Sequence, residues 1–408
     1  MIFRKRKTEI NESLNYIAWQ RFKRNKLSLG GMVFIVLSAM IALFGYIITP
    51  DKSAFANNQI LEISTRKPGF KVQMLKVRKN EIQQNSGFLS TMFFGRMDTY
   101  NYIPINSYHF DRDKILIQEF NDIEGEESFY SEINIADVIY PLKFGEKVKI
   151  NNSQIEFTLV NNKKESIDLK QAHQLIEKEN IITKRFLLGT DRFGRDLLSR
   201  LLIGTRVSLS VGFISVFISL LIGITLGSLA GFYRGKVDDL IMWLINVIWS
   251  IPTLLMVIAI TLVIGKGFWQ IFIAVGLTMW VEVARVVRGQ VLSIREKEYV
   301  EAARALGFSN RRIIFRHILP NVMSPVIIIS AANFATAILL EAGLSFLGIG
   351  VQPPVPSWGT MIKEHYGYII MDKAYLAILP GLAIMFLVLS FTLVGNGLRD
   401  ALDTKGSN

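Results

Sequence analysis

The sequence predicts an all-α polytopic membrane protein with six transmembrane helices and a β-rich insert between the first and the second. Half of its 408 residues are apolar, and the mean hydropathy is positive, at +0.33. The apolar residues are concentrated in six segments, which is typical of a membrane protein. Residues 51–185 interrupt the series with 19 basic and 19 acidic residues, so the net charge of +12 belongs to the rest of the chain. Because those basic residues flank apolar segments, they indicate membrane topology rather than nucleic-acid binding.

The first predicted transmembrane helix covers residues 29–49, after a basic arm at 1–28. This apolar run has no charged residue, and about 20 helical residues cross a hydrocarbon core of ~30 Å. A cleaved signal peptide is the alternative, since Ala54-Phe55-Ala56 resembles a cleavage site. The run is too long and its basic lead too extended for that alternative.

The insert, residues 50–186, is predicted to be a separate β-rich domain. Alternating apolar and polar residues at 147–150 and 155–159 predict a β-hairpin. Two further segments, 114–120 and 131–140, have the composition of strands, and residues 166–180 are expected to form one helix.

The core, residues 187–403, is predicted to contain five more membrane-spanning helices, followed by a tail at 404–408. They are expected at 207–232, 238–264, 268–289, 322–348 and 374–396. Helices are required because an unpaired backbone group in lipid costs several kcal/mol. Six spans put both termini on one side of the membrane.

The short loops predict the orientation. The arm at 1–28 and the loop at 285–320 carry eight Lys and Arg residues each, whereas the opposite loops carry few. Since basic loops face the cytoplasm, both termini are predicted to be cytoplasmic and the insert extracytoplasmic.

Several site classes are excluded or disfavoured by composition. The chain has no Cys, which rules out disulfides, a thiol nucleophile and Cys-ligated metals. Its four His residues lack metal-ligand spacing. Gly235-Lys236 is not part of a phosphate-binding P-loop, because the first Gly of that motif is absent. We therefore expect no catalytic residues, no metal site and no cofactor in this chain, and no enzymatic activity.

The loop at 285–320 contains the most informative segment, a short helix, a glycine turn and a second helix. Small side chains allow close approach by another protein, and nearby arginines give the patch a positive rim. An amphipathic helix lying on anionic lipid fits the residues equally well. The residues expected to form this element are Glu298, Glu301, Ala302, Ala303, Gly307, Arg311, Arg312, Leu319 and Pro320.

This segment resembles the "EAA" loop of permease subunits of bacterial ABC importers, and further motifs resemble the dipeptide/oligopeptide/nickel branch of that family. Those motifs are Trp19-Gln20-Arg21-Phe22, Leu188-Gly189-Thr190-Asp191-Arg192-Phe193-Gly194-Arg195-Asp196, Leu344-Ser345-Phe346-Leu347-Gly348 and Ser357-Trp358-Gly359. The resemblance covers about residues 15–50 and 186–403.

The resemblance implies the ABC importer permease fold, located in the bacterial inner membrane. It implies a second permease subunit, two ATP-binding subunits that hold ATP and Mg²⁺, and an extracytoplasmic substrate-binding protein. The 298–320 segment would then couple ATP hydrolysis in the partner subunits to substrate movement. Besides these partners, only membrane lipid is expected, and no nucleic acid.

Five residues are candidates for the pore or a gate. Glu282, Asn333 and Glu341 are polar residues within predicted spans, where polar groups are functional hypotheses by default. Glu282 is alternatively expected to pair with Arg285 or Arg288, and Glu341 to be a structural acid. Asp191 and Arg195 precede the second span and are expected to form an outer gate or a salt-bridged elbow.

The predicted function is a channel subunit that moves di- or oligopeptides inward by alternating access. Two alternatives remain, a transporter of the same class that carries nickel and a membrane-anchored sensor or scaffold that acts through its insert. A sensor has no need for a docking element between the fourth and fifth spans, which favours the transporter.

Overall fold

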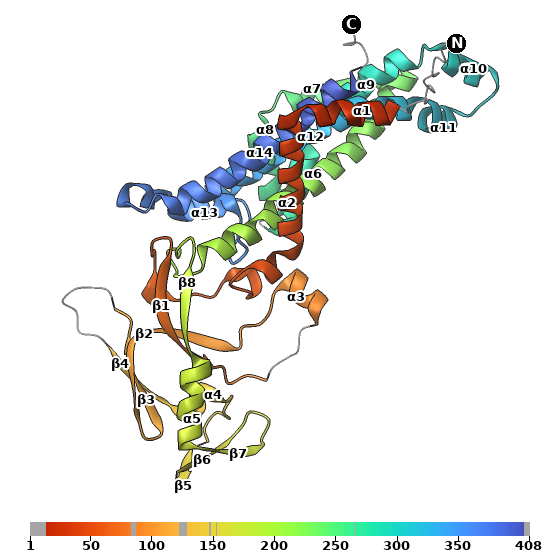
Figure 1. Ribbon diagram of the computed structural model, residues 1–408. Coiled ribbons are helices and arrows are strands. Elements are labelled where there is room, and N and C mark those ends of the chain that lie inside the picture. The colour runs from red at the N-terminus through yellow and green to blue at the C-terminus, as the bar shows by residue number, and fades with distance from the viewer. Residues whose placement is uncertain are drawn as a thin grey trace, which may run out of the picture.

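The computed structural model describes residues 14–82, 87–121, 129–146, 148–151, 153–265 and 267–403. Long helices form a bundle, and a smaller β-rich unit extends from one end of it (Figure 1). The short helix α1 and the end of α14 lie at the opposite end of the bundle. The helices of the bundle are α1 (Leu14–Arg24), α2 (Lys26–Ile48), α6 (Leu197–Tyr233), α7 (Gly235–Trp249), α8 (Thr253–Ile264), α9 (Phe268–Ile294), α10 (Glu298–Ala305), α11 (Asn310–Arg312), α12 (Leu319–Leu347), α13 (Trp358–His365) and α14 (Tyr375–Leu402).

Five helical segments in the described part of the chain are long and apolar enough to cross a membrane. They are α2, α6, α9, α14 and the segment Asn310–Leu347, which ends with α12. Helices α7 and α8 pass the same test only as a pair, and they are bent by 92°. The prediction of one continuous helix over 238–264 is therefore wrong. Pro252 explains the break, because it lacks an N–H and disfavours helical backbone at the residue before it.

Several helix boundaries differ from the predicted ones. Helix α6 begins at Leu197 rather than at 207, because the Asp196 carboxylate caps it by accepting a hydrogen bond from the Ser199 N–H at 2.8 Å. Helix α9 continues to Ile294, so the predicted loop at 285–320 is helical over its first residues. Helix α1 lies within the arm that the sequence suggested only to be polar and basic.

The most extensive packing between two helices of the bundle joins α6 to α9, and glycines of α6 spaced four residues apart lie in this contact. A Cβ atom added to Gly223 would lie 2.5 Å from Val283 Cβ. At Gly227 it would lie 2.5 Å from the Ala284 carbonyl oxygen. Small residues at this spacing let two helix backbones approach, which is how membrane helices gain packing energy without a hydrophobic driving force.

The β-rich unit contains two antiparallel sheets. The larger has the strand order β4-β3-β2-β1-β8 and the smaller β5-β6-β7. Three short helices, α3 (Phe88–Phe94), α4 (Ile135–Ile139) and α5 (Leu169–Leu175), accompany them. The strands are β1 (Phe70–Arg78), β2 (Tyr100–Asp111), β3 (Lys114–Glu119), β4 (Tyr130–Asn134), β5 (Lys149–Asn151), β6 (Gln154–Thr158), β7 (Lys164–Asp168) and β8 (Ile181–Phe186).

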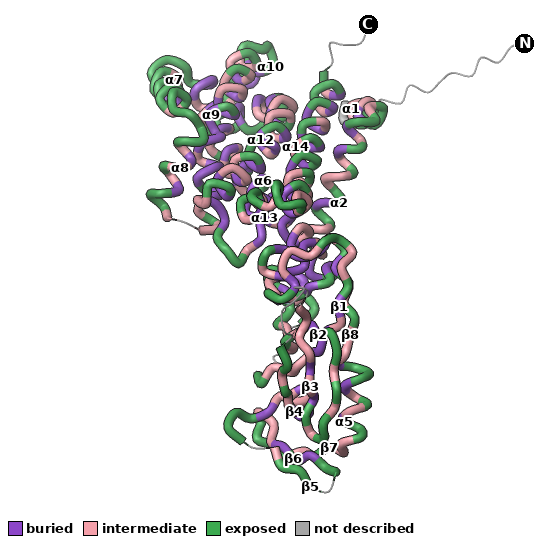
Figure 2. The backbone as a smooth tube through the Cα atoms, turned by 90° about the vertical axis from the view of Figure 1, so that its left-hand side faces the viewer, coloured by how far each residue is buried: buried purple, intermediate pink, exposed green. Residues whose placement is uncertain are grey.

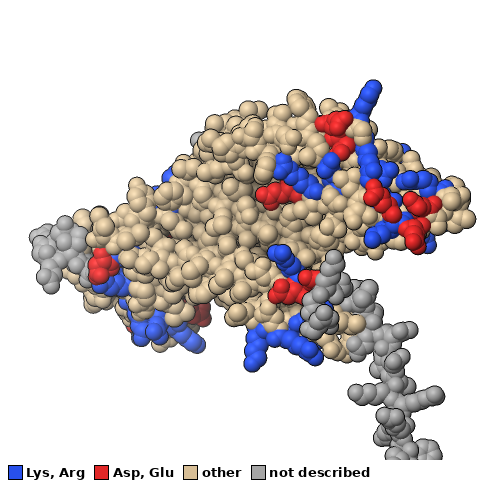
Figure 3. Space-filling view, turned by 90° about the horizontal axis from the view of Figure 1, so that it is seen from above, with Lys and Arg blue, Asp and Glu red and all other residues tan. Residues whose placement is uncertain are grey.

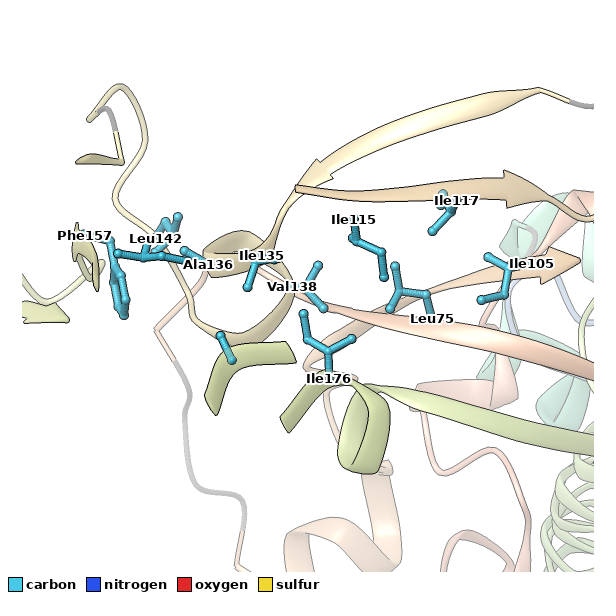
Figure 4. Packing of buried hydrophobic residues seen from close by; sticks show 12 residues of the cluster. Leu75, Ile105, Ile115, Ile117, Ile135, Ala136, Val138, Leu142, Phe157 and Ile176 are labelled. Carbon is cyan, nitrogen blue, oxygen red and sulfur yellow. The ribbon is translucent and has the colours of Figure 1, made fainter. Parts of the chain in front are cut away.

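This unit has a hydrophobic core of its own. Leu75 and Ile105 from the larger sheet and Ile176, after α5, are buried together with Ile135 and Val138 of α4 (Figure 4). The insert therefore packs as a domain rather than as an extended loop.

The strand predictions are partly correct. The expected hairpin exists, with Ile150 opposite Ile155, although Lys147 and Asn152 lie outside the described residues. The segment 114–120 corresponds to β3. Two other predictions, the strand at 131–140 and the helix at 166–180, are wrong in part. In each segment a strand ends at a residue that caps the N-terminus of a helix.

Asn134 and Asp168 are these N-caps. The Ala136 N–H donates to Asn134 Oδ1, so the predicted strand 131–140 becomes helix α4 after residue 134. The Lys170 N–H donates likewise to Asp168 Oδ1, so the predicted helix 166–180 begins only at Leu169. It ends as a single π-helical turn at Ile176–Asn180.

Candidate functional site

The first candidate element is α10 with the glycine turn that follows it. Val300 and Ala303 are buried in a cluster that includes Val291 of α9 and Ile313 after α11. The turn is closed by hydrogen bonds from Gly307 N to the Arg304 carbonyl oxygen at 3.0 Å and from Phe308 N to the Ala303 carbonyl oxygen at 3.2 Å. The short helix is thus held firmly against the end of the bundle.

The opposite side of α10 is open. Glu298, Glu301, Ala302 and Gly307 are exposed, whereas Ala303 faces the core. Gly307 has φ +74°, and a Cβ atom added to it would meet nothing within 4 Å. The exposed side of α10 therefore makes no packed contact at Gly307 within the described part of the chain.

The other predicted residues of the loop surround this surface. Arg311, Arg312 and Pro320 are exposed, and Leu319 is half-buried at the start of α12. The Arg312 guanidinium lies 4.1 Å from the ring centroid of Phe308, which holds it over the turn. Seen from above, many charged side chains gather at the right of the view, further groups lie at its left and lower edges, and a broad surface without charge lies between them (Figure 3).

Three exposed apolar residues of this element were not among the predicted site residues. They are Tyr299, Leu306 and Phe315, with 45%, 73% and 70% of their surface exposed. Large apolar side chains are unusual within a charged loop, so these residues could have been recognised in the sequence as candidates for a binding surface. The arginines of this element are exposed as well, and exposed apolar and basic side chains on one element suit docking to another protein.

The second candidate is a buried charge cluster where the insert meets the bundle. The Arg195 Nε–H donates to Asp191 Oδ2 at 2.6 Å, and Arg195 Nη2 donates to Glu364 Oε2 at 3.0 Å. Arg200 Nε lies 3.6 Å from the same Asp191 oxygen. Both predicted residues, Asp191 and Arg195, are therefore in one network, together with Arg200 and Glu364, which the sequence did not suggest.

This network joins three parts of the chain. Arg195 also donates to the Asn57 side chain at 3.1 Å, and Thr190 accepts a hydrogen bond from the Arg66 N–H at 2.8 Å. Buried residues gather at the junction of the bundle and the β-rich unit (Figure 2). The arrangement is that of a salt-bridged elbow that fixes the insert to α6 and α13.

A glycine in the elbow permits the close approach. Gly194 has φ +70°, and a Cβ atom at this position would lie 1.6 Å from the Ile60 carbonyl oxygen. No side chain fits there, so the segment before α6 and the insert are in direct backbone contact.

His365 completes the cluster. Its Nδ1 lies 2.7 Å from the Met361 carbonyl oxygen, and its Nε2 accepts a hydrogen bond from the Arg192 N–H at 3.4 Å. Burial lowers the pKa of the imidazole below its usual value, and the bond to Met361 offsets part of this effect. Donor atoms of Asp191, Glu364 and His365 lie within 4.8 Å of one another, as metal ligands can. Since Arg195 already binds both carboxylates, the geometry is that of an ion-pair network.

A small cavity of about 120 Å³ lies beside the bend between α7 and α8. Glu282 lines it together with Met256 and Met279. The prediction that Glu282 pairs with Arg285 or Arg288 is wrong, because both arginines have other partners. Arg288 instead forms an ion pair with Asp238, and Arg285 donates to Asn246.

Asn333 and Glu341 lie within α12 and are both buried, and neither lines this cavity, to which α12 contributes Thr336 and Leu340. Glu341 Oε1 accepts a hydrogen bond from the Ser345 hydroxyl at 2.6 Å, and the same hydroxyl accepts one from the Val351 N–H at 3.2 Å. Glu341 therefore supports the loop after α12, which favours the structural interpretation of this acid.

Comparison with protein-family models identifies two matches. Residues 223–407 match the model described as "Binding-protein-dependent transport system inner membrane component". Residues 13–65 match the "N-terminal TM domain of oligopeptide transport permease C". The two matches lie on either side of the larger part of the insert.

Curated relatives are similar to rather more than half of this chain. The chain is 43% identical over 218 residues to the glutathione transport system permease protein GsiD of Pectobacterium atrosepticum, covering 53% of this chain and 72% of that protein. It is 45% identical over 225 residues to the di/tripeptide transport system permease protein DppC of Pseudomonas aeruginosa, covering 55% and 74%. It is 39% identical over 231 residues to the oligopeptide transport system permease protein OppC of Bacillus subtilis, covering 57% and 75%.

Among solved structures, the inward-facing methionine ABC transporter MetNI aligns with a TM-score of 0.43 and 19% sequence identity, covering 51% of this chain and 98% of that chain. The curated relatives and the family models show that the chain belongs to the family of binding-protein-dependent, inner-membrane permease subunits of ABC importers.

Proposed function

We propose that this chain is a channel-forming subunit of an ATP-driven importer for di- or oligopeptides. It would pair with a second permease and would receive substrate from an extracytoplasmic binding protein. Two ATP-binding subunits would hold ATP and Mg²⁺ and perform the hydrolysis. This chain would contribute the membrane path and the coupling contact, and no catalytic residue.

The observation that carries the proposal is the two-sided character of α10. One side, with Val300 and Ala303, is fixed in the core, and the other side exposes Ala302 and Gly307 beside a basic and apolar rim. A rigid element can transmit displacement, and an exposed element that combines small and apolar side chains can enter a groove on a partner. Both properties are needed to convert a movement of an ATPase into a movement of helices.

The proposed topology has six crossings, with the bent pair α7 and α8 counted as one. The basic residues near α1 and α10 support a cytoplasmic location for that end of the bundle, and hence for both termini. The insert would then be extracytoplasmic. The cavity lined by Glu282, Met256 and Met279 is our candidate for part of the substrate path.

Relatives named for dipeptides, oligopeptides and glutathione support a peptide substrate. Nickel is not favoured by these names. The flexible thioethers of Met256 and Met279 are also suited to side chains of varied shape.

The proposal is tested by isolating the chain from its native membrane with the subunits that accompany it. The assembly is reconstituted in vesicles with its binding protein and assayed with labelled dipeptides, tripeptides and Ni²⁺. We expect peptide uptake that requires ATP on the side of α10. Uptake of Ni²⁺ without peptide uptake would contradict the substrate, and absence of attached ATPases would contradict the function.

A further inference from the structure

Helix α3 of the insert has a composition unlike its surroundings. No residue from Phe88 to Gly95 is charged, although the insert as a whole is rich in charge. Of its apolar side chains, Phe88 is 68% exposed, Leu89 67% and Phe94 74%, and the nearby Met97 is 77% exposed. Such a concentration of large apolar side chains on an exposed helix indicates a surface that is covered by something other than water.

The helix is held in a defined position. The Gly95 N–H donates to the Thr91 carbonyl oxygen at 3.0 Å, and the Arg96 N–H donates to the Lys52 carbonyl oxygen at 2.7 Å. Arg206 of α6 donates from Nη1 to the Phe93 carbonyl oxygen at 2.9 Å. These bonds connect α3 to the bundle, so its exposed side chains are presented at a fixed level.

Helix α3 lies at the same height as one end of a membrane-spanning helix. Helix α3 packs against α2 and lies beside the end that carries Ile48 (Figure 1). Ile48 is itself 58% exposed, and Leu37, three turns earlier on the same face of α2, is 52% exposed. The apolar surface of α3 therefore continues the lipid-facing surface of α2.

The neighbouring residues are typical of a membrane–water boundary. The Arg206 guanidinium lies 5.2 Å from the Tyr46 ring centroid, and the Tyr46 hydroxyl accepts a hydrogen bond from the Phe55 N–H at 3.0 Å. Aromatic and arginine side chains with polar tips are enriched at the headgroup level.

We propose that α3 is a lipid-inserted anchor, with Phe88, Leu89 and Phe94 buried among the acyl chains at the Ile48 end of α2. A bilayer that covers the lipid-facing side of α2 also reaches α3, because the two helices are in contact. The anchor would fix the height of the insert above the membrane. This inference goes beyond the transport function, and it requires only that α2 spans the bilayer.

The chain contains no Cys, so single-cysteine variants can be labelled without background. Phe94→Cys and Leu89→Cys in the full-length chain are spin-labelled and reconstituted in vesicles of phosphatidylethanolamine and phosphatidylglycerol. Collision rates with oxygen, which concentrates in the bilayer, and with a water-soluble nickel chelate then report depth. Val36→Cys is the lipid-exposed control, and Phe144→Cys, at a position 99% exposed in the insert, is the aqueous control.

We expect the labels at 94 and 89 to give oxygen-to-chelate collision ratios between those at 36 and 144, and at least several times the ratio at 144, because α3 lies at the end of the span that carries Val36. Labels that match position 144 would overturn the proposal. Labels shielded from both reagents would also overturn it, because they would indicate a protein partner on α3.

Discussion

At the level of single residues, neighbouring small side chains in the loop have different roles. Ala302 and Ala303 are equivalent in the sequence, but Ala303 is buried beside Val300 and Ala302 is exposed. Gly307 satisfies a backbone requirement, with φ +74°, and leaves the space beside it empty. The exposed side of α10 is therefore defined by Ala302 and Gly307.

Gly307→Asn tests this assignment. Asn tolerates a left-handed backbone, and its side chain would project into open space, so the fold should be preserved. We expect an unchanged thermal midpoint and a loss of ATP-driven uptake of about tenfold or more, equivalent to about 1.4 kcal/mol of docking energy.

The matched control is Gly145→Asn in the insert, where φ is +85° and a Cβ atom likewise meets nothing within 4 Å. This variant should transport normally. Normal uptake by the variant at 307 would contradict the docking role of that glycine.

His365 gives the elbow a pH dependence whose sign follows from its environment. Because burial lowers the pKa of the folded-state imidazole, the unfolded chain binds the proton more readily. Stability contributed by neutral His365 is fully present above the ordinary pKa of about 6.5 and falls as the pH drops below it.

We expect the thermal midpoint of the chain to fall between pH 7.5 and pH 5.5, and His365→Gln to reduce that fall. His109→Gln, at an exposed position of β2, serves as the control and should leave the fall unchanged. An identical pH dependence in all three proteins would contradict the assigned role of His365.

The sequence predicts contacts between residues that are close along the chain, but not contacts between distant residues. Asp191 and Arg195 were recognisable as a charge cluster because they are four residues apart. Glu364 and His365 join them only through the fold, and no local pattern indicates that contact.

At the level of elements, the length of the apolar segments predicted the long helices well, because the thickness of the bilayer sets that length. It did not predict the bend between α7 and α8, since hydropathy is continuous across Pro252. It also did not predict α4 or the position at which α5 begins, because Asn134 and Asp168 act as helix caps immediately after strands. The information was present in the cap residues, but the apolar pattern alone favours a different assignment.

The glycine contact between α6 and α9 makes a prediction at this scale. Gly227→Ala adds a methyl group 2.5 Å from the Ala284 carbonyl oxygen, which should destabilise the bundle by about 1–3 kcal/mol. Gly30→Ala, on α2 with nothing within 4 Å, should be neutral or stabilising by up to about 1 kcal/mol, because Ala favours helix.

Thermal unfolding of the two variants in detergent gives the comparison. Equal midpoints for both would mean that α6 and α9 are not in close contact in the membrane.

At the level of the whole molecule, the candidate docking surface and the β-rich insert lie at opposite ends of the bundle (Figure 1). Helix α6 connects them, since it begins at the buried charge cluster and packs along α9, which leads to α10. A displacement of α10 would therefore act on a pair of helices fixed to each other by close glycine contacts. This arrangement suits a subunit that is moved by a motor outside the chain.

Crosslinking from Ala302→Cys in native membranes shows whether the exposed side of α10 contacts an ATP-hydrolysing subunit. We expect a crosslinked product that contains an ATPase, whose yield changes when ATP is bound, and no such product from Phe144→Cys in the insert. Capture of no ATPase from position 302 in an assembly that still transports peptides would contradict this contact.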